Sequence, residues 1–259
     1  MIQNIYPLFE RYRILKKEYL WSLRDCSFGF MQVEYAEYAD GFLTGCGISV
    51  RPDCIEIAPG LVKHRGFLYL FPEIQQVPYS PSGQFVSLKF RLKKKQVFQD
   101  YIDYTAEPFL DSNLERGEDE LELCRFKLQP GFRLRDDYKD FQDIETEFDT
   151  VNLLHATWGG LGGPTLAPAI TRFFARSVLG ERTADPYDLQ FCSLCLDRPT
   201  AVPRLLIEQY VRVKLELDGE PLDNQALFRH LELILRNLRS GGSLRPPGKH
   251  RRSREIFVD

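Results

Sequence analysis

The chain has 259 residues, of which 43% are hydrophobic and 27% are charged. Its 34 basic and 37 acidic residues give a net charge of −3, so charge alone requires neither a nucleic-acid nor a membrane partner. Plentiful aliphatic and aromatic side chains exclude a largely disordered chain, and 18 glycines and 16 prolines without a period exclude a collagen-like one.

The cysteine content and the hydropathy pattern bear on the compartment. Six cysteines in a chain of this length are too sparse for the disulfide framework of a small secreted protein. The first residues show no secretory signal pattern, and no apolar run approaches the roughly 18 residues that a membrane helix needs. We therefore expect a protein that is made in a reducing cytoplasm and is not inserted into a membrane.

The first predicted element is a helix over residues 7–25, within an N-terminal segment 1–26. Apolar side chains recur at spacings of three and four residues, at Leu8, Tyr12, Leu15, Tyr19 and Leu23. Basic side chains occupy the other faces: Arg11, Arg13, Lys16, Lys17 and Arg24. A nucleic-acid-binding helix is one interpretation, but a solvated face of long basic side chains is favoured.

Residues 27–135 have the pattern of a β-rich domain. Turn signals separate short apolar stretches at 42–50, 54–57, 61–63 and 67–71. Pro59-Gly60 suits the centre of a type II turn, and Arg65-Gly66 suits a hairpin. Short strands at regular spacing predict an antiparallel β-sandwich or a small barrel.

Two longer strands are predicted in the same domain. Residues 85–92 alternate between apolar and polar side chains, which predicts a half-buried strand with one face in water. Residues 120–128 alternate and then change phase after Leu123. This change predicts a β-bulge or a strand that is buried on both sides.

Residues 136–240 are predicted to be a helical domain, so that the whole chain is of the α+β class. An apolar stripe runs from Phe141 to Leu154 and leads to the glycine cluster at 158–163. The cluster lacks the Gly-Lys-Ser/Thr ending of a phosphate-binding loop, so it is interpreted as a flexible connection between helices. Further helices are predicted at 170–179, after Asp185-Pro186, at 205–215 and at 222–238.

The last segment, 241–259, combines glycine, proline and basic residues and is predicted to be a tail that is disordered or ordered by a partner. It supplies four candidate interface residues: Arg245, Lys249, Arg251 and Arg252. Four carboxylates would share one stripe of a helix: Asp136, Asp140, Asp143 and Glu147. Because a helix face spreads them along its axis, a solvated or docking surface is favoured over a metal site.

The cysteines and histidines favour structural roles. Cys192 and Cys195 lie inside a predicted helix without a second ligand pair nearby, which favours a buried structural pair over a redox or zinc motif. The four histidines show no ligand spacing. A hydrolase that uses His155 and the acidic stripe stays open only because catalytic triads assemble in space. We expect no metal, no cofactor and no small-molecule substrate.

One stretch resembles a known class of proteins. The pattern begins with Tyr38-x-Asp40-Gly41-Phe42-Leu43-x-Gly45-Cys46 and continues through Ile55-x-Ile57-Ala58-Pro59-Gly60 to Gly66-x-Leu68-Tyr69. It is similar to a pattern of tail-fibre and baseplate-attachment proteins of tailed phages. A later segment, from Glu120 through Gly131 to Asp136, resembles the part that closes such modules. With residues 14–18 and 23–25, which resemble prophage-region proteins of Firmicutes, the resemblance spans residues 14–150.

The resemblance implies structural roles for the turn positions Asp40, Gly41, Gly45, Pro59, Gly60, Gly66 and Gly131. Two departures matter: the chain becomes helical where a fibrous shaft usually follows, and Cys124 stands at a position that is usually alanine. A compact adaptor therefore fits better than a fibre.

The resemblance, together with the lack of a catalytic motif, predicts a structural adaptor and not an enzyme. Such a protein would belong to a phage-like tail or contractile injection particle, either at the baseplate or linking the baseplate to receptor-binding fibres. It would form a homo-oligomer among other tail and baseplate proteins, in the cytoplasm during assembly and in the virion or tail particle afterwards. The alternative is a nucleic-acid-binding or regulatory protein that uses the basic N-terminal helix and the basic C-terminal tail.

Overall fold

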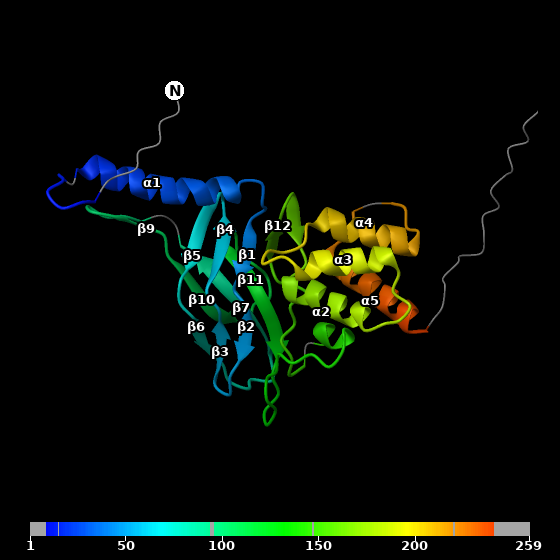
Figure 1. Ribbon diagram of the computed structural model, residues 1–259. Helices are drawn as coiled ribbons and strands as arrows, with labels where there is room; N and C mark the ends of the chain where they lie inside the picture. Colours follow the sequence, from blue (N-terminus) through cyan, green and yellow to red (C-terminus); the bar gives the residue numbers. More distant parts are fainter. Residues whose placement is uncertain (1–8, 15, 94–95, 147, 220, 241–259) are drawn as a thin grey trace, which may run out of the picture.

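The computed structural model describes residues 9–14, 16–93, 96–146, 148–219 and 221–240 (Figure 1). A long N-terminal helix is followed by a β-rich body and then by a helical lobe. The α+β class is thus confirmed. None of the helices in the described ranges is long and apolar enough to cross a membrane.

The body contains short strands, most of them separated by only a few residues of the chain. They are β1 (Gly41–Gly45), β2 (Ile48–Val50), β3 (Cys54–Ile57), β4 (Gly60–His64), β5 (Phe67–Phe71), β6 (Gln75–Pro78), β7 (Phe85–Leu92), β8 (Gln96–Val97), β9 (Ile102–Asp103), β10 (Ala106–Asp111), β11 (Glu120–Lys127), β12 (Trp158–Gly160) and β13 (Gly163–Thr165). The predicted stretch 42–50 is divided into two strands, which belong to different sheets.

The strands form open sheets rather than a closed barrel. One sheet has the order β13-β12-β1-β4-β5, and it is antiparallel except for the β1–β12 pair. Two smaller antiparallel sheets have the orders β10-β7-β11 and β2-β3-β6, and β8 and β9 form a separate ribbon. Phe90 of β7 packs edge-to-face against Phe42 and Phe71, with ring centroids 5.3 and 5.0 Å apart. The core therefore lies between the five-stranded sheet and the sheet of β7.

β7 has the predicted bounds, but of its predicted wet face only Arg91 is exposed. Ser87 and Lys89 are as fully buried as Leu88 and Phe90. The prediction was wrong for Lys89 because acidic side chains of Asp111 and Glu120 bind its ammonium group, which allows the charge to be buried. In β11 the register shifts between Glu122 and Cys124, and most of the strand is buried, so the predicted bulge and the double-sided burial are both confirmed.

The glycine cluster is not a connection between helices. Trp158–Gly160 and Gly163–Thr165 form the β12–β13 hairpin at one edge of the five-stranded sheet. A Cβ atom at Gly159 would lie 2.2 Å from the carbonyl oxygen of Ala39, so only glycine fits there. The turn itself contains Gly162 with φ +76°. The prediction failed because glycine is used both in flexible connections and where two backbones approach closely in a sheet, and the sequence alone does not distinguish the two.

The two predicted turns near residue 60 have different outcomes. Arg65 and Gly66 have φ of 48° and 76° and join β4 to β5 as a hairpin, as predicted. Gly60 lies in β4 and not in the left-handed region, so the predicted type II turn at Pro59-Gly60 is wrong. Glycine is required there because a Cβ would lie 2.2 Å from the sulfur of Cys46.

The helical lobe consists of α2 (Pro168–Leu179), α3 (Pro186–Leu196), α4 (Arg204–Leu215) and α5 (Asn224–Ser240). These helices lie within a few residues of their predicted positions. Asp185 and Asp188 form the capping box that begins α3, which confirms the predicted start signal. α3 packs mainly on α2, and α4 on α5.

The predicted helix that begins at Asp136 is wrong. Between β11 and β12, the described residues contain a single helical element, the short 3₁₀ helix Gln142–Glu145. The aspartates of this segment bind backbone amides, since Asp136 accepts a hydrogen bond from the Val50 amide at 2.9 Å and Asp140 accepts one from Asp143 at 2.9 Å. Such bonds compete with a regular helix.

Candidate interaction surfaces

The most exposed of the described helices is the N-terminal one, α1, which spans Lys17–Glu34. None of its residues is buried. It therefore begins ten residues later and ends nine residues later than the predicted helix 7–25, and three of the five predicted basic residues, Arg11, Arg13 and Lys16, precede it. α1 itself carries two basic and three acidic residues, so the expected basic helix is not found.

α1 is attached to the body near its C-terminal end. The ammonium group of Lys63, in β4, donates hydrogen bonds to the carbonyl oxygens of Tyr35, Ala36 and Tyr38 at 2.9, 2.9 and 2.7 Å. These carbonyls lie just past the helix, where a positive charge also complements the helix dipole. From this anchor α1 extends away from the helical lobe (Figure 1).

Large apolar side chains lie on two opposite sides of α1. Trp21 and Phe28 are seven residues apart and share one side; we call it the Trp21 flank. Leu23 and Phe30 are also seven residues apart. Each follows a residue of the first pair by two positions, and two helical positions turn the side chain by about 200°, so this pair lies on the opposite side. We call the full stripe on that side the Leu20 flank: Lys16, Leu20, Leu23, Ser27, Phe30 and Glu34. All six residues are exposed, and Phe30 is 71% exposed.

A groove of about 650 Å³ runs between the C-terminal half of α1 and the body. Phe30 and Glu34 of the Leu20 flank line one wall. Leu70 and Phe71 of β5 line the other, and Leu70 is 63% exposed. The described part of the chain thus leaves apolar side chains facing each other across an open groove, an arrangement that suits the insertion of an apolar side chain from outside.

The ribbon of β8 and β9 adds a further exposed apolar group. Its exposed hydrophobic residues are Val97, Phe98, Tyr101 and Ile102. The rings of Phe98 and Tyr101 stack with centroids 4.7 Å apart. In the view of Figure 1 the ribbon extends toward the same end of the molecule as α1. This end therefore carries more exposed apolar material than the rest of the body.

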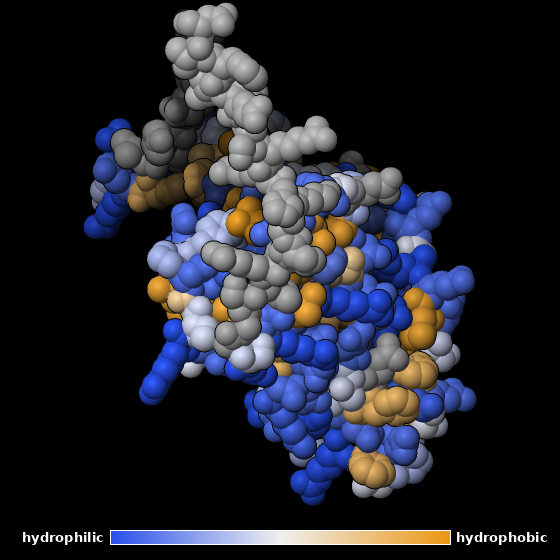
Figure 2. Space-filling model, turned by 90° about the vertical axis from the view of Figure 1, so that its right-hand side faces the viewer, coloured by the Kyte–Doolittle hydropathy of each residue, from blue (hydrophilic) through white to orange (hydrophobic). Residues whose placement is uncertain are grey.

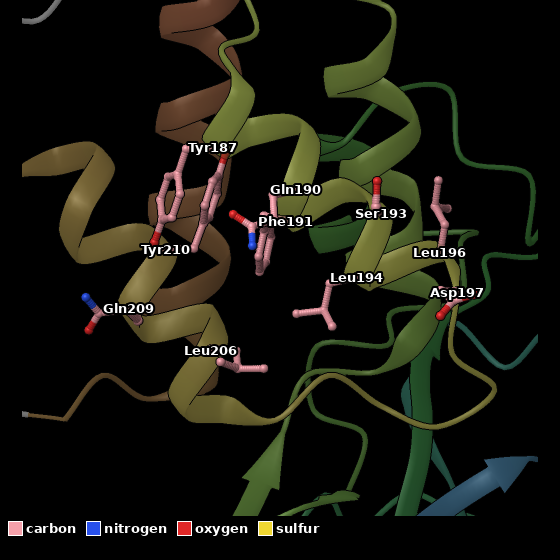
Figure 3. A pocket seen from close by; sticks show the side chains of 10 residues that line it. All are labelled: Tyr187, Gln190, Phe191, Ser193, Leu194, Leu196, Asp197, Leu206, Gln209 and Tyr210. Atoms are coloured by element: carbon pink, nitrogen blue, oxygen red, sulfur yellow. The ribbon is translucent and has the colours of Figure 1, made fainter.

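A second groove, of about 790 Å³, lies between α3 and α4 in the helical lobe. Leu194 of α3 and Leu206 of α4 point into it, and Tyr187 and Tyr210 lie at one end (Figure 3). Gln190, Gln209, Ser193 and Asp197 provide polar groups around it. An apolar groove between two helices with a polar rim is the usual receptor for an amphipathic helix or another apolar segment.

A buried polar network fixes the geometry of this groove. Asp188 is fully buried and accepts hydrogen bonds from the hydroxyl of Tyr210 at 2.7 Å and from the ammonium of Lys214 at 2.9 Å. Burial, together with the bond to Asp188, raises the pKa of Tyr210, so the phenol stays a donor. The ring of Tyr210 stacks on Phe191 with centroids 3.9 Å apart. α3 and α4 are therefore held at a fixed separation.

Figure 2 views the molecule from the side of the helical lobe, where hydrophobic residues form separate patches among hydrophilic ones. Leu196, which lines the groove, is exposed, and other exposed apolar side chains on α3 and α4 are Leu189, Leu205 and Val213. No sequence pattern predicted this groove. It arises where two helices that are consecutive in the chain pack on different neighbours, which hydrophobic periodicity does not reveal.

A small pocket of about 350 Å³ contains His155. Arg116, Thr157 and Asp223 also line it, and Arg116 donates a hydrogen bond to the Thr157 hydroxyl at 2.7 Å. Asp223 caps α5 through the amide of Ala226. The described carboxylates of the acidic stripe do not line this pocket. The structure thus does not bring His155 and the stripe together.

The acidic stripe is engaged within the chain. Asp143 forms a two-pronged ion pair with Arg135, with both oxygen–nitrogen distances 2.6 Å. Hydrogen bonding to Arg135 lowers the pKa of Asp143, although partial burial opposes the shift. Asp136 and Asp140 bind backbone amides, as described above. Glu147 and the tail residues Arg245, Lys249, Arg251 and Arg252 lie outside the described residues. An interface role for these positions stays a prediction.

The turn positions lie where the chain reverses or where strands approach closely. Asp40 accepts a hydrogen bond from the Arg65 amide at 2.6 Å. Gly41, Gly45 and Gly131 have positive φ. Cβ atoms at Gly41 and Gly45 would also meet backbone oxygens, at 2.5 and 2.1 Å.

Cys192 and Cys195 are buried free cysteines on α3. Burial raises the pKa of Cys192 to about 12 and raises that of Cys195 as well, so both are thiols at neutral pH. Among the described residues, no group of three or more His, Cys, Asp or Glu side chains could hold a metal ion.

Comparison with known proteins gives little further guidance. No family model matches the chain, and no curated protein matches it. A solved structure, that of TssK, is similar. The similarity covers 92% of this chain and 72% of that chain, with 11% sequence identity and a TM-score of 0.42. Values this low do not establish a shared fold or function.

Proposed function

We propose that this chain is a structural adaptor of a contractile injection or phage-type tail particle, located at the baseplate or between the baseplate and its fibres. The observation that carries the proposal is the pair of apolar surfaces on opposite ends of the molecule. α1 with its groove projects from one end, and the α3/α4 groove lies in the lobe at the other (Figure 1). An adaptor needs two such surfaces.

Energetic considerations support an assembly role for α1. A helix of 18 residues without a buried side chain is marginal in water, because most helix stability in proteins comes from packing. α1 also contains Gly29 and several aromatic and small polar residues, which are weak helix formers. A partner that covers its apolar flanks would supply the missing packing.

The kind of particle comes from the resemblance of residues 38–69 to baseplate-attachment proteins. The turn geometry at Gly41, Gly45 and Gly66 is that of a tight β-module, which suits a rigid attachment unit. The proposal assigns no catalytic step to any residue.

The test is to isolate tail-like particles from the source organism on a density gradient and to quantify this chain. We expect it to sediment with sheath and tube proteins at a fixed ratio. Leu194→Ser combined with Leu206→Ser should remove the chain from the particles, because both side chains point into the α3/α4 groove. Phe132→Ser, at an exposed position in the loop after β11 and outside the groove, is the control.

Absence of the wild-type chain from intact particles would overturn the proposal. If the groove variant stays in the particles at the wild-type ratio, the α3/α4 groove is not one of the surfaces by which the chain binds the particle. Circular dichroism of each purified variant ensures that a loss reflects the surface and not unfolding.

A further inference from the structure

The order of residues along the Leu20 flank of α1 is complementary to itself when reversed, which points to a second copy of the chain as its binding partner. Its residues follow helical spacings of four and three: Lys16, Leu20, Leu23, Ser27, Phe30 and Glu34. When two copies of this stripe are laid antiparallel, Lys16 faces Glu34 of the other copy, Leu20 faces Phe30, and Leu23 faces Ser27. Every charged residue then meets its opposite, and every large apolar residue meets an apolar or small one.

We infer that α1 pairs antiparallel with α1 of a second copy of this chain through the Leu20 flank. The pairing is isologous, so each contact occurs twice about a two-fold axis. A parallel arrangement would place Lys16 beside Lys16 and Glu34 beside Glu34, and like charges at neighbouring positions are destabilising. The charge pattern therefore selects the antiparallel arrangement.

The groove beside α1 fits this arrangement. Phe30 and Glu34 line the groove, and they are the residues that face Leu20 and Lys16 of the second copy. The Leu20 side chain of the second copy would thus enter the groove, between Phe30 and Leu70. Both side chains are more than half exposed in the single chain. Pairing would cover them and would also supply the packing that α1 lacks.

The Trp21 flank is left outside the pair. Lys17 lies over the Trp21 ring, with its ammonium 5.2 Å from the ring centroid, and Arg24 pairs with Asp25 at 2.6 Å. These local contacts partly cover the flank and satisfy its charges within the same helix. They make this flank a matched control for the Leu20 flank.

Sedimentation equilibrium of the purified full-length chain tests the inference, under reducing conditions because Cys26 is exposed. We expect a reversible dimer. Lys16→Glu and Glu34→Lys should each weaken dimerisation roughly tenfold, since each creates two like-charge contacts per dimer. The double variant Lys16→Glu/Glu34→Lys restores opposite charges at both contacts and should return the dissociation constant to near the wild-type value.

A second pair of variants tests the apolar contact. Phe30→Ser should weaken the dimer by more than the charge variants, and Phe28→Ser on the Trp21 flank should leave it unchanged. A wild-type chain that stays monomeric at all accessible concentrations would overturn the inference. The inference would also be overturned if the charge variants left the dissociation constant unchanged or if the double variant did not restore it. A larger effect of Phe28→Ser than of Phe30→Ser would overturn it as well. Because only the purified chain is used, the outcome is independent of whether the chain enters a particle.

Discussion

In the β-rich body, away from the proposed interfaces, a buried charged side chain is paired with side chains of opposite charge. Lys89, on the central strand β7, is fully buried. Its ammonium group binds Asp111 at 2.9 Å, the carbonyl oxygen of Glu115 at 2.5 Å and Glu120 at 3.4 Å. A buried charge is tolerated only with such partners, so the cluster ties β7, β10 and β11 together.

Removing both acids should destabilise the body strongly. Asp111→Asn combined with Glu120→Gln leaves the Lys89 ammonium buried without a counter-charge, and we expect a loss of about 3 kcal/mol in the free energy of unfolding. Urea denaturation measures it. Lys93→Met with Glu107→Gln removes an exposed pair, with a 2.9 Å contact, between the residue just after β7 and β10, and should have little effect. Equal losses in the two variants would contradict the role given to burial.

The ion pair of Asp143 with Arg135 should appear in the pH dependence of stability. The Arg135 bond lowers the pKa of Asp143 in the folded chain, so the contribution is complete above the ordinary Asp pKa of about 3.9 and is lost as pH falls through the lowered value. Asp143→Asn should cost about 1–2 kcal/mol near neutral pH, and the difference from wild type should shrink in acid. Urea melts from pH 7 to pH 2 measure it, with Asp137→Asn as an exposed control. A difference that persists unchanged at the lowest pH would refute this assignment.

At the scale of elements, sequence patterns predicted those strands and helices that bury one face. The capping box of α3, the hairpin at Arg65-Gly66 and the bulge in β11 could all be predicted because each depends on neighbouring residues in the chain. The burial of Lys89 could not, because its partners Asp111 and Glu120 lie 22 and 31 residues away. The position of α1 could not be predicted either, because a helix without a buried face leaves no hydrophobic period that marks its ends.

The anchor of α1 gives a prediction at this scale. Lys63→Met removes three charge-assisted hydrogen bonds to carbonyl groups at the end of the helix. We expect amide hydrogens of α1 to exchange roughly tenfold faster, while those of β4 and β5 keep their protection. Lys93→Met, at an exposed lysine just after β7, is the control. If exchange in α1 is unchanged, the helix is attached by other contacts and the anchor is unimportant.

The molecule as a whole has one apolar surface at each end. The described carboxylates of the acidic stripe and the buried charges are engaged within the chain, whereas α1 and the α3/α4 groove keep large apolar side chains exposed. Pairing through α1 would join two copies, and each copy would keep its helical lobe available for another component. The arrangement thus favours a two-fold linking unit.

Hydrogen–deuterium exchange of the chain, dilute and free or bound in isolated particles, tests this account most directly. We predict that two separate regions gain protection on assembly: residues 17–34 of α1 together with β5, and residues 186–215 around the α3/α4 groove. The β7 region should be equally protected in both states, because the middle of the strand, from Ser87 to Phe90, is already buried in the single chain. Protection gained in neither region, or only in the core of the body, would contradict the account.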